Sequence, residues 1–289
     1  MLIQKTVIFL LSACVICAFI ILGAGELLTR PATQRIGLPP SDFQAETVNI
    51  NTESGGIVSG WFSLSSQNRG AILLLHGVRA NRYQMLERAK ALKQEGYSVL
   101  LIDLPAHGES TGKRITFGYQ ESKGVIAAYQ FLRSKLPDRR IGIIGVSLGA
   151  ASVVFANLSP SPDAIVLESM YPTITQATEN RLIMRLGELG KYMTPLLLMQ
   201  LPMRLGITAQ DLEPIKHLGK IKSPVLVAAG TKDLHTKWAE TLNIFAAIQS
   251  VKSLYPVIEA AHIDLFAFNP DRYKNQVFTF LHNHVAKDG

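Results

Sequence analysis

Apolar and polar positions follow two different periods along most of this chain. Short apolar runs of strand length are separated by longer segments in which apolar residues recur at helical spacing. The expected strands are residues 46–51, 57–64, 71–75, 99–102, 141–146, 164–167, 225–229 and 254–258. The expected helices are residues 83–94, 119–136, 148–157, 236–248 and 272–284. Short, nearly all-apolar strands between helices predict an α/β fold whose mostly parallel, eight-stranded sheet is flanked by helices.

One segment interrupts this alternation. Residues 171–221 separate the sixth and seventh strands, where a single crossover helix would suffice. They predict further helices, including residues 174–186 and residues 194–205, the second of which is apolar on most sides. An insertion at this place would lie above the strand ends, so we expect a helical cap.

The chain begins with a long apolar stretch, in which no residue from Val7 to Gly25 is charged. A helix of that length spans about 28 Å, close to the thickness of the hydrocarbon core of a bilayer. We therefore expect residues 1–28 to form an N-terminal membrane anchor or signal segment. The alternatives are a signal peptide cleaved near Gly23 and a lipoprotein, because the sequence before Cys14 resembles a lipobox.

Residues 29–44 contain Pro31, Pro39 and Pro40 and show little periodicity, which is typical of a tether. Residues 45–289 are then one large domain that includes the cap at about 171–221. A very short N-terminal tail usually stays in the cytoplasm, so an anchored domain would be extracytoplasmic, in the periplasm or at the cell surface. A cleaved signal would instead give a secreted protein.

Composition excludes several classes of protein. The 289 residues carry a net charge of +7 that is spread along the chain, and no basic block interleaves with aromatic residues, so nucleic acid is not an expected partner. A basic surface is compatible with the anionic face of a membrane. Both cysteines, Cys14 and Cys17, lie in the first apolar stretch. The domain therefore has no disulfide, cysteine nucleophile or cysteine metal site.

The segment from Gly145 to Gly149 carries the clearest chemical signal. It reads Gly-Val-Ser-Leu-Gly, follows a strand-like run and precedes a helix-like run. A sharp strand-to-helix turn of this kind places Ser147 at its tip, above the carboxyl edge of the sheet, where a serine can act as a nucleophile. The helix N-terminus would stabilise negative charge that develops beside it.

Two residues later in the chain complete a candidate triad. His262 follows the last strand and would be the general base, and Asp233 follows the strand before it and would orient His262. The order serine, aspartate, histidine is typical of α/β-hydrolases. Glu168, directly after the sixth strand, is the alternative acid.

Acyl transfer also needs two donors that converge on an oxyanion. One would be the backbone N–H of Leu148, directly after the serine. The other would come from the loop after residues 71–75, where Val78 is the candidate. Arg79 and Arg82 in this loop would either carry surface charge or meet an anionic group of a substrate.

These landmarks resemble the α/β-hydrolase superfamily over residues 45–285. The matching residues, in order, are His76-Gly77, the run from Asp103 to Ser110, Gly145 to Gly149, Asp233 and His262. Residues 115–121 and 262–265 are similar to its Bem46-like and serine-aminopeptidase-like branch. The resemblance departs from that branch at Ala150, where relatives often have glycine, and at Gly124, where many have aspartate.

The sequence therefore predicts a membrane-anchored serine hydrolase that cleaves an ester, thioester or amide through an acyl-enzyme. A carboxylesterase or lipase-like activity on a small acyl substrate is the main reading, with Ser147, Asp233 and His262 as triad and Val78 and Leu148 as oxyanion hole. The alternatives are an acyltransferase or peptidase on the same triad and a non-catalytic, membrane-tethered binding protein. Neither a cofactor nor a metal is expected, and the oligomeric state stays open.

Overall fold

The computed structural model describes residues 2–286. One sheet of eight strands runs through the domain in the order β10-β9-β8-β7-β4-β5-β3-β2. β2 and β3 form an antiparallel hairpin, β3 also pairs antiparallel with β5, and all other neighbouring strands are parallel. The bounds are β2 (Glu46–Asn51), β3 (Ile57–Ser63), β4 (Ala71–Leu75), β5 (Ser98–Ile102), β7 (Ile141–Val146), β8 (Ala164–Glu168), β9 (Val225–Gly230) and β10 (Lys252–Val257). The predicted eight-stranded, mostly parallel sheet is confirmed.

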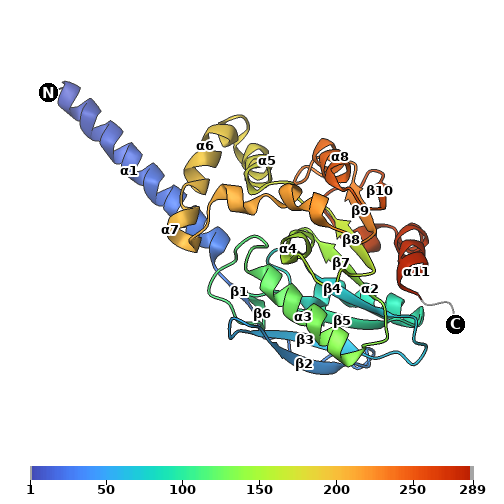
Figure 1. Cartoon of the computed structure of the whole chain (residues 1–289). Coiled ribbons are helices and arrows are strands. Elements are labelled where there is room, and N and C mark those ends of the chain that lie inside the picture. The colour runs from blue at the N-terminus through green and yellow to red at the C-terminus, as the bar shows by residue number, and fades with distance from the viewer. Residues whose placement is uncertain (1, 287–289) are drawn as a thin grey trace.

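Helices cover both faces of the sheet, as Figure 1 shows. Buried side chains of α3 (Glu121–Lys135), α4 (Leu148–Ala156) and α8 (Trp238–Ala247) form one apolar layer with the sheet. Side chains of α2 (Leu86–Gln94) and α11 (Thr279–Val285) form a second layer on the other face. Because β4 and β7 are buried on both faces, almost every residue in them is apolar.

Shorter helical segments lie between these strands and helices. A 3-10 turn (Arg82–Met85) precedes α2, and α9 (Leu265–Phe268) follows β10. The predicted helix over residues 272–284 is present in three pieces: α10 (Pro270–Tyr273), a π-helical turn (Lys274–Phe278) and α11.

The cap follows β8, the sixth strand of the sheet, as predicted. It consists of α5 (Ile174–Leu186), α6 (Leu189–Leu198), α7 (Leu201–Leu205) and two 3-10 segments, Ala209–Leu212 and Pro214–Lys220. The prediction of one helix over residues 194–205 is wrong, because the chain breaks between α6 and α7. Pro202 lies in the first turn of α7, where its missing N–H has no intrahelical partner to satisfy.

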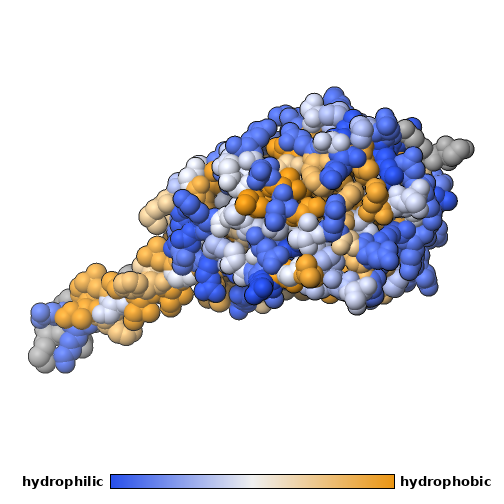
Figure 2. All heavy atoms as spheres, turned by 90° about the horizontal axis from the view of Figure 1, so that it is seen from below, coloured by the Kyte–Doolittle hydropathy of each residue, from blue (hydrophilic) through white to orange (hydrophobic). Residues whose placement is uncertain are grey.

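The N-terminal helix α1 (Leu2–Thr29) projects from the domain beside α6 and α7 (Figure 1). An 18-residue window within its residues 4–29 has a mean hydropathy of 2.9, so the helix is long and apolar enough to cross a membrane. Figure 2 shows α1 as an apolar rod that leaves a body whose visible face is mostly polar. The side chain of Cys14, on which the lipoprotein reading depends, lies outside the part of the chain that the structure describes.

Residues 29–44, which we call the strap, are packed on the domain and are not a loose tether. Within the strap, β1 (Ala32–Thr33) pairs in parallel with β6 (His107–Gly108). Glu109 accepts hydrogen bonds of 3.0 Å from the backbone N–H groups of Ile36 and Gly37. The proline-rich composition indicated a free linker, but these hydrogen bonds attach the backbone of the strap to the surface of the domain.

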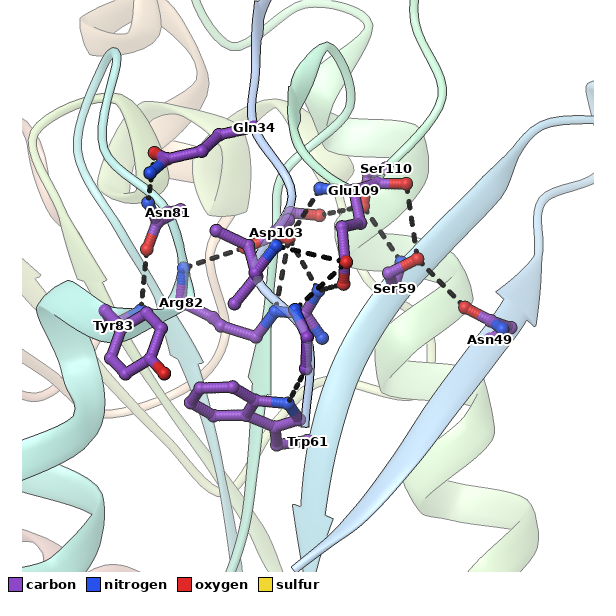
Figure 3. Close-up of polar contacts among 12 residues, drawn as sticks. Gln34, Asn49, Ser59, Trp61, Asn81, Arg82, Tyr83, Asp103, Glu109 and Ser110 are labelled. Carbon is purple, nitrogen blue, oxygen red and sulfur yellow. Dashed lines mark hydrogen bonds and ion pairs between the residues drawn. The ribbon is translucent and has the colours of Figure 1, made fainter. Parts of the chain in front are cut away.

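Arg82 lies under the strap, and Figure 3 shows its guanidinium between two carboxylates. Its Nη2 is 2.9 Å from Asp103 Oδ2 and also forms an ion pair with Glu109. Since the Arg82 side chain is fully buried, it neither carries surface charge nor reaches a substrate, which corrects both readings from the sequence. Its role is to hold the loop that follows β4 against the loop that follows β5.

Candidate active site

The turn between β7 and α4 has the geometry of a nucleophile elbow. Ser147 has φ of 50° and ψ of −104°, a strained conformation for a residue with a side chain. A Cβ on Gly149 would lie 2.7 Å from the carbonyl oxygen of Leu75, and one on Gly145 would lie 2.7 Å from the nitrogen of Ala150. Both positions therefore require glycine, and the spacing Gly-x-Ser-x-Gly follows from the close approach of β7, α4 and β4.

His262 and Asp233 meet at the carboxyl ends of β10 and β9. His262 Nδ1 lies 2.7 Å from Asp233 Oδ2. The other carboxylate oxygen of Asp233 accepts hydrogen bonds from the backbone N–H groups of His235 and Thr236, at 2.8 and 2.9 Å. Asp233 is buried, while 21% of the His262 side chain is exposed. The His235 ring stacks on the His262 ring at 4.7 Å between centroids, and burial lowers the pKa of His235.

Glu168, the alternative acid, is engaged elsewhere. Its carboxylate forms an ion pair of 2.7 Å with Arg88 and accepts a hydrogen bond from the Tyr273 hydroxyl. Arg88 also binds Asp264 at 2.8 Å, two residues after His262. The structure therefore pairs His262 with Asp233, and the buried Arg88 ties the His262 loop to the end of β8. The sequence gives no local signal for this role of Arg88, since its partners lie 80 and 176 residues away.

The loop after β4 is held through both backbone polar groups of Gly77, its N–H and its carbonyl. Leu104 N–H donates to His76 Nε2 at 3.0 Å, so the ring proton is on Nδ1, which donates to the Gly77 carbonyl at 2.7 Å. A planar, trans peptide turns the Val78 N–H away from that carbonyl. Gln84 accepts from the Gly77 N–H at 2.7 Å. Burial lowers the pKa of His76 to about 3, which keeps this ring neutral.

Ser147 opens into a pocket that also contains both predicted oxyanion-hole residues, Val78 and Leu148. The first amides of a helix have no intrahelical partner, so the Leu148 N–H at the start of α4 is available. The pocket has a volume of about 180 Å³. The rest of its wall is mostly apolar and comes from α1, the cap and the loop before α3: Leu28, Phe117, Tyr171, Ile174, Ala177, Leu182 and Leu197.

The pocket also contains arginines that the sequence interpretation did not select. Arg181 and Arg185 of α5 line it together with Arg79. Arg79 donates to the carbonyl oxygens of Leu27 and Arg30 at the end of α1. The cap sequence did not mark Arg181 or Arg185, because their position over Ser147 depends on the fold of the insertion.

Two features of the described residues bear on chemistry. No hydrogen bond joins Ser147 to His262 within residues 2–286, and such contacts in enzymes without substrate are often long and tighten when substrate binds. In the same residues, no group of three or more histidine, cysteine, aspartate or glutamate side chains could hold a metal ion.

Comparisons with known proteins agree with this architecture. Residues 66–201 match the family described as "Serine aminopeptidase, S33". The Bacillus subtilis protein YqkD is 24% identical over 238 residues, covering 81% of this chain and 78% of that protein. The Mycobacterium tuberculosis protein Rv2307c is 28% identical over 188 residues, covering 64% of this chain and 61% of that protein.

Solved structures show the same fold. The Pyrococcus furiosus esterase Pf2001 superposes with a TM-score of 0.72 at 24% identity, covering 88% of this chain and 99% of that chain. A thermophilic esterase from Thermogutta terrifontis superposes with a TM-score of 0.60 at 17% identity, covering 83% and 100% of the two chains. The chain therefore has the fold of these hydrolases, and its residues 66–201 are similar to the serine aminopeptidase family.

Proposed function

We propose that this protein is a serine esterase that works through an acyl-enzyme. Ser147 attacks the carbonyl carbon of the substrate while His262 Nε2 accepts the serine proton. Asp233 holds His262 through Nδ1 and stabilises the imidazolium that forms. The observation that carries the proposal is the 2.7 Å contact of His262 with Asp233 at the same sheet edge as a strained Ser147.

The remaining steps use groups already in place. The N–H groups of Val78 and Leu148 stabilise the oxyanion of the tetrahedral intermediate. His262 then donates its proton to the leaving alcohol, and the acyl group stays on Ser147. Water activated by His262 releases the acyl group and restores the serine. The mostly apolar wall of the pocket supports an acyl ester over a charged peptide as substrate.

Turnover of a chromogenic acyl ester by the full-length protein in detergent tests this proposal. Ser147→Ala should lower kcat by a factor on the order of 10⁶, because the nucleophile is lost. Ser152→Ala is the matched control: Ser152 lies one turn later in α4, and its hydroxyl donates to the Leu148 carbonyl at 2.7 Å. Retention of more than a few per cent of turnover by Ser147→Ala would rule out the assigned nucleophile.

We further propose that α1 anchors the domain to a membrane, with the domain on the extracytoplasmic side. The length and hydropathy of residues 4–29 support the anchor. The full-length protein should stay in the membrane pellet after an alkaline wash, and protease added to intact cells should degrade the domain. Release of a protein cleaved near Gly23 would support the signal peptide instead.

A further inference from the structure

The position of the cap on α1 has a consequence for where the substrate comes from. Gln200 donates to the carbonyl oxygen of Ile21 at 3.0 Å, and Arg204 donates to that of Leu22 at 2.6 Å. Glu26 forms ion pairs with Arg204 and Arg114, at 2.7 and 2.5 Å. The cap and the end of α1 are therefore joined by specific hydrogen bonds and an ion pair.

The contacts at Ile21 and Leu22 lie within the segment that would span the bilayer. The uncharged run of α1 is residues 7–25, and a hydrocarbon core of about 30 Å needs about 20 helical residues. Since the cap already contacts Ile21 and Leu22, the run can span the core only if the cap lies against the bilayer surface. The cap carries apolar side chains that suit this place, each at least 42% exposed: Met184, Leu186, Leu189, Tyr192, Leu196, Met199 and Met203.

The active-site pocket reaches the same junction. Leu28 of α1 and Leu197 of α6 line the cavity that contains Ser147. The end of the anchor is thus part of the wall of the pocket. An acyl chain that leaves the bilayer beside α1 would meet Leu28 and Leu197 before it reaches the serine.

Two of the three arginines that line this pocket, Arg181 and Arg185, form no ion pair with any residue that the structure describes. Arg181 donates to the Ala177 carbonyl at 2.8 Å. Burial lowers the pKa of Arg181, but a guanidinium stays charged at neutral pH. Arg181 is partly buried and the carboxylates of Asp233 and Glu240 act on it only from beyond ion-pair distance, while Arg185 is exposed beside it. Removing a charged group from water without a direct partner is costly, so an anion on the ligand would be a favourable direct partner for Arg181.

We infer that the substrate is an anionic acyl ester of the bilayer, whose phosphate or carboxylate binds Arg181 and Arg185 while its acyl chain enters along Leu28 and Leu197. This inference rests on the proposed esterase function and adds the substrate class. The reaction is hydrolysis: the acyl C–O bond breaks, water supplies the new C–O bond, and the anionic alcohol leaves with the proton from His262.

Octanoyl glycerol phosphate and octanoyl glycerol, which differ in one anionic group, test the anion site. The full-length protein in mixed micelles should show a higher kcat/KM for the phosphate ester. In Arg181→Gln the ratio of the two kcat/KM values should fall by about 10- to 100-fold, since a charged hydrogen bond is lost. A ratio cancels any effect of the substitution that is common to both substrates. Arg185→Gln should also lower this ratio. Because the Arg185 side chain is exposed, this substitution should leave the fold intact.

Arg140→Gln is the matched control, because Arg140 is exposed at the opposite end of β7 from Ser147. A wild-type ratio near one, with octanoyl glycerol still hydrolysed, would overturn the anion site and leave the esterase proposal standing. Hydrolysis of neither ester would instead overturn the esterase proposal itself.

A second experiment distinguishes an ester taken from the bilayer from an ester taken from solution. The protein is reconstituted in phosphatidylcholine vesicles, and a long-chain acyl glycerol phosphate is placed either in the same vesicles or in separate ones. Hydrolysis should be faster when enzyme and ester share a bilayer. Equal initial rates in the two cases, or a preference only for short-chain soluble phosphate esters, would overturn the bilayer source.

Discussion

His262 Nδ1 lies 2.7 Å from Asp233 Oδ2, and the second oxygen of Asp233 is occupied by two backbone N–H groups. The carboxylate is therefore fixed and can impose one orientation and one tautomer on the imidazole. Asp233→Asn should lower kcat by about 10⁴ because the amide favours the wrong tautomer. Ester turnover and thermal unfolding of the same preparation measure this. An Asp233→Asn protein within tenfold of wild type would contradict the assigned role.

Glu168→Gln should lower the stability of the fold and largely retain activity, in contrast to Asp233→Asn. The substitution leaves the buried Arg88 without its fully buried carboxylate partner, so the free energy of unfolding should fall by about 3 kcal/mol. Activity per folded molecule should stay within about tenfold of wild type. Denaturant unfolding and active-site titration separate the two effects. A loss of kcat near 10⁴ with normal stability would move the acid to Glu168.

His76 predicts acid sensitivity of the fold. Its pKa is lowered to about 3 by burial in the folded chain, whereas an unfolded histidine has a pKa near 6.5. Between these pH values only the unfolded state binds the proton, so stability falls as pH falls, by about 1.4 kcal/mol per pH unit. In His76→Asn, the free energy of unfolding in urea should fall less steeply between pH 7 and pH 4, by about 1.4 kcal/mol per pH unit less than in the wild type. An unchanged slope in His76→Asn would contradict the prediction.

Gly149 tests the packing of the elbow. A Cβ there would lie 2.7 Å from the Leu75 carbonyl oxygen and 2.8 Å from that of His76, both backbone atoms. Gly149→Ala should lower the free energy of unfolding by about 1–3 kcal/mol and reduce turnover by shifting Ser147. In the control Gly219→Ala, the nearest atom lies 3.8 Å from the new Cβ, so stability should hold. Equal effects of the two substitutions would argue against the tight elbow.

The apolar pocket predicts a preference for longer acyl chains. Each buried CH₂ contributes up to about 0.8 kcal/mol, so four added carbons could raise kcat/KM by tens to hundreds of fold. A series of neutral esters from acetyl to dodecanoyl measures the dependence. A flat or falling series would show that the pocket is not an acyl site.

The sequence predicted those features that depend on local signals. Short segments of sequence predict the succession of strands along the chain and the turn at Ser147. They also place Asp233 and His262 directly after strands. The contact between Asp233 and His262 follows once β9 and β10 are neighbours. The fold therefore brings together two residues that the chain keeps 29 positions apart.

Features that depend on distant partners could not be predicted in the same way. The break between α6 and α7 comes with packing of the cap on α1, and the strap is held by Glu109, more than seventy residues later. A surface position was one of the two roles expected for Arg82, because no residue near it in the sequence indicates that it pairs with Asp103 in the interior. Leu28 and Arg181 join the pocket only when α1 and the cap meet over Ser147.

The most direct measurement is the mapping of a fluorophosphonate adduct on the full-length protein by mass spectrometry. This reagent reacts with a serine only where a base and an oxyanion hole activate it. The account predicts one adduct, on Ser147, that is lost in Ser147→Ala and strongly slowed in Asp233→Asn and His262→Ala. Labelling of a different serine, or no labelling of a folded protein, would contradict the assignment of Ser147, His262 and Asp233 as its catalytic triad.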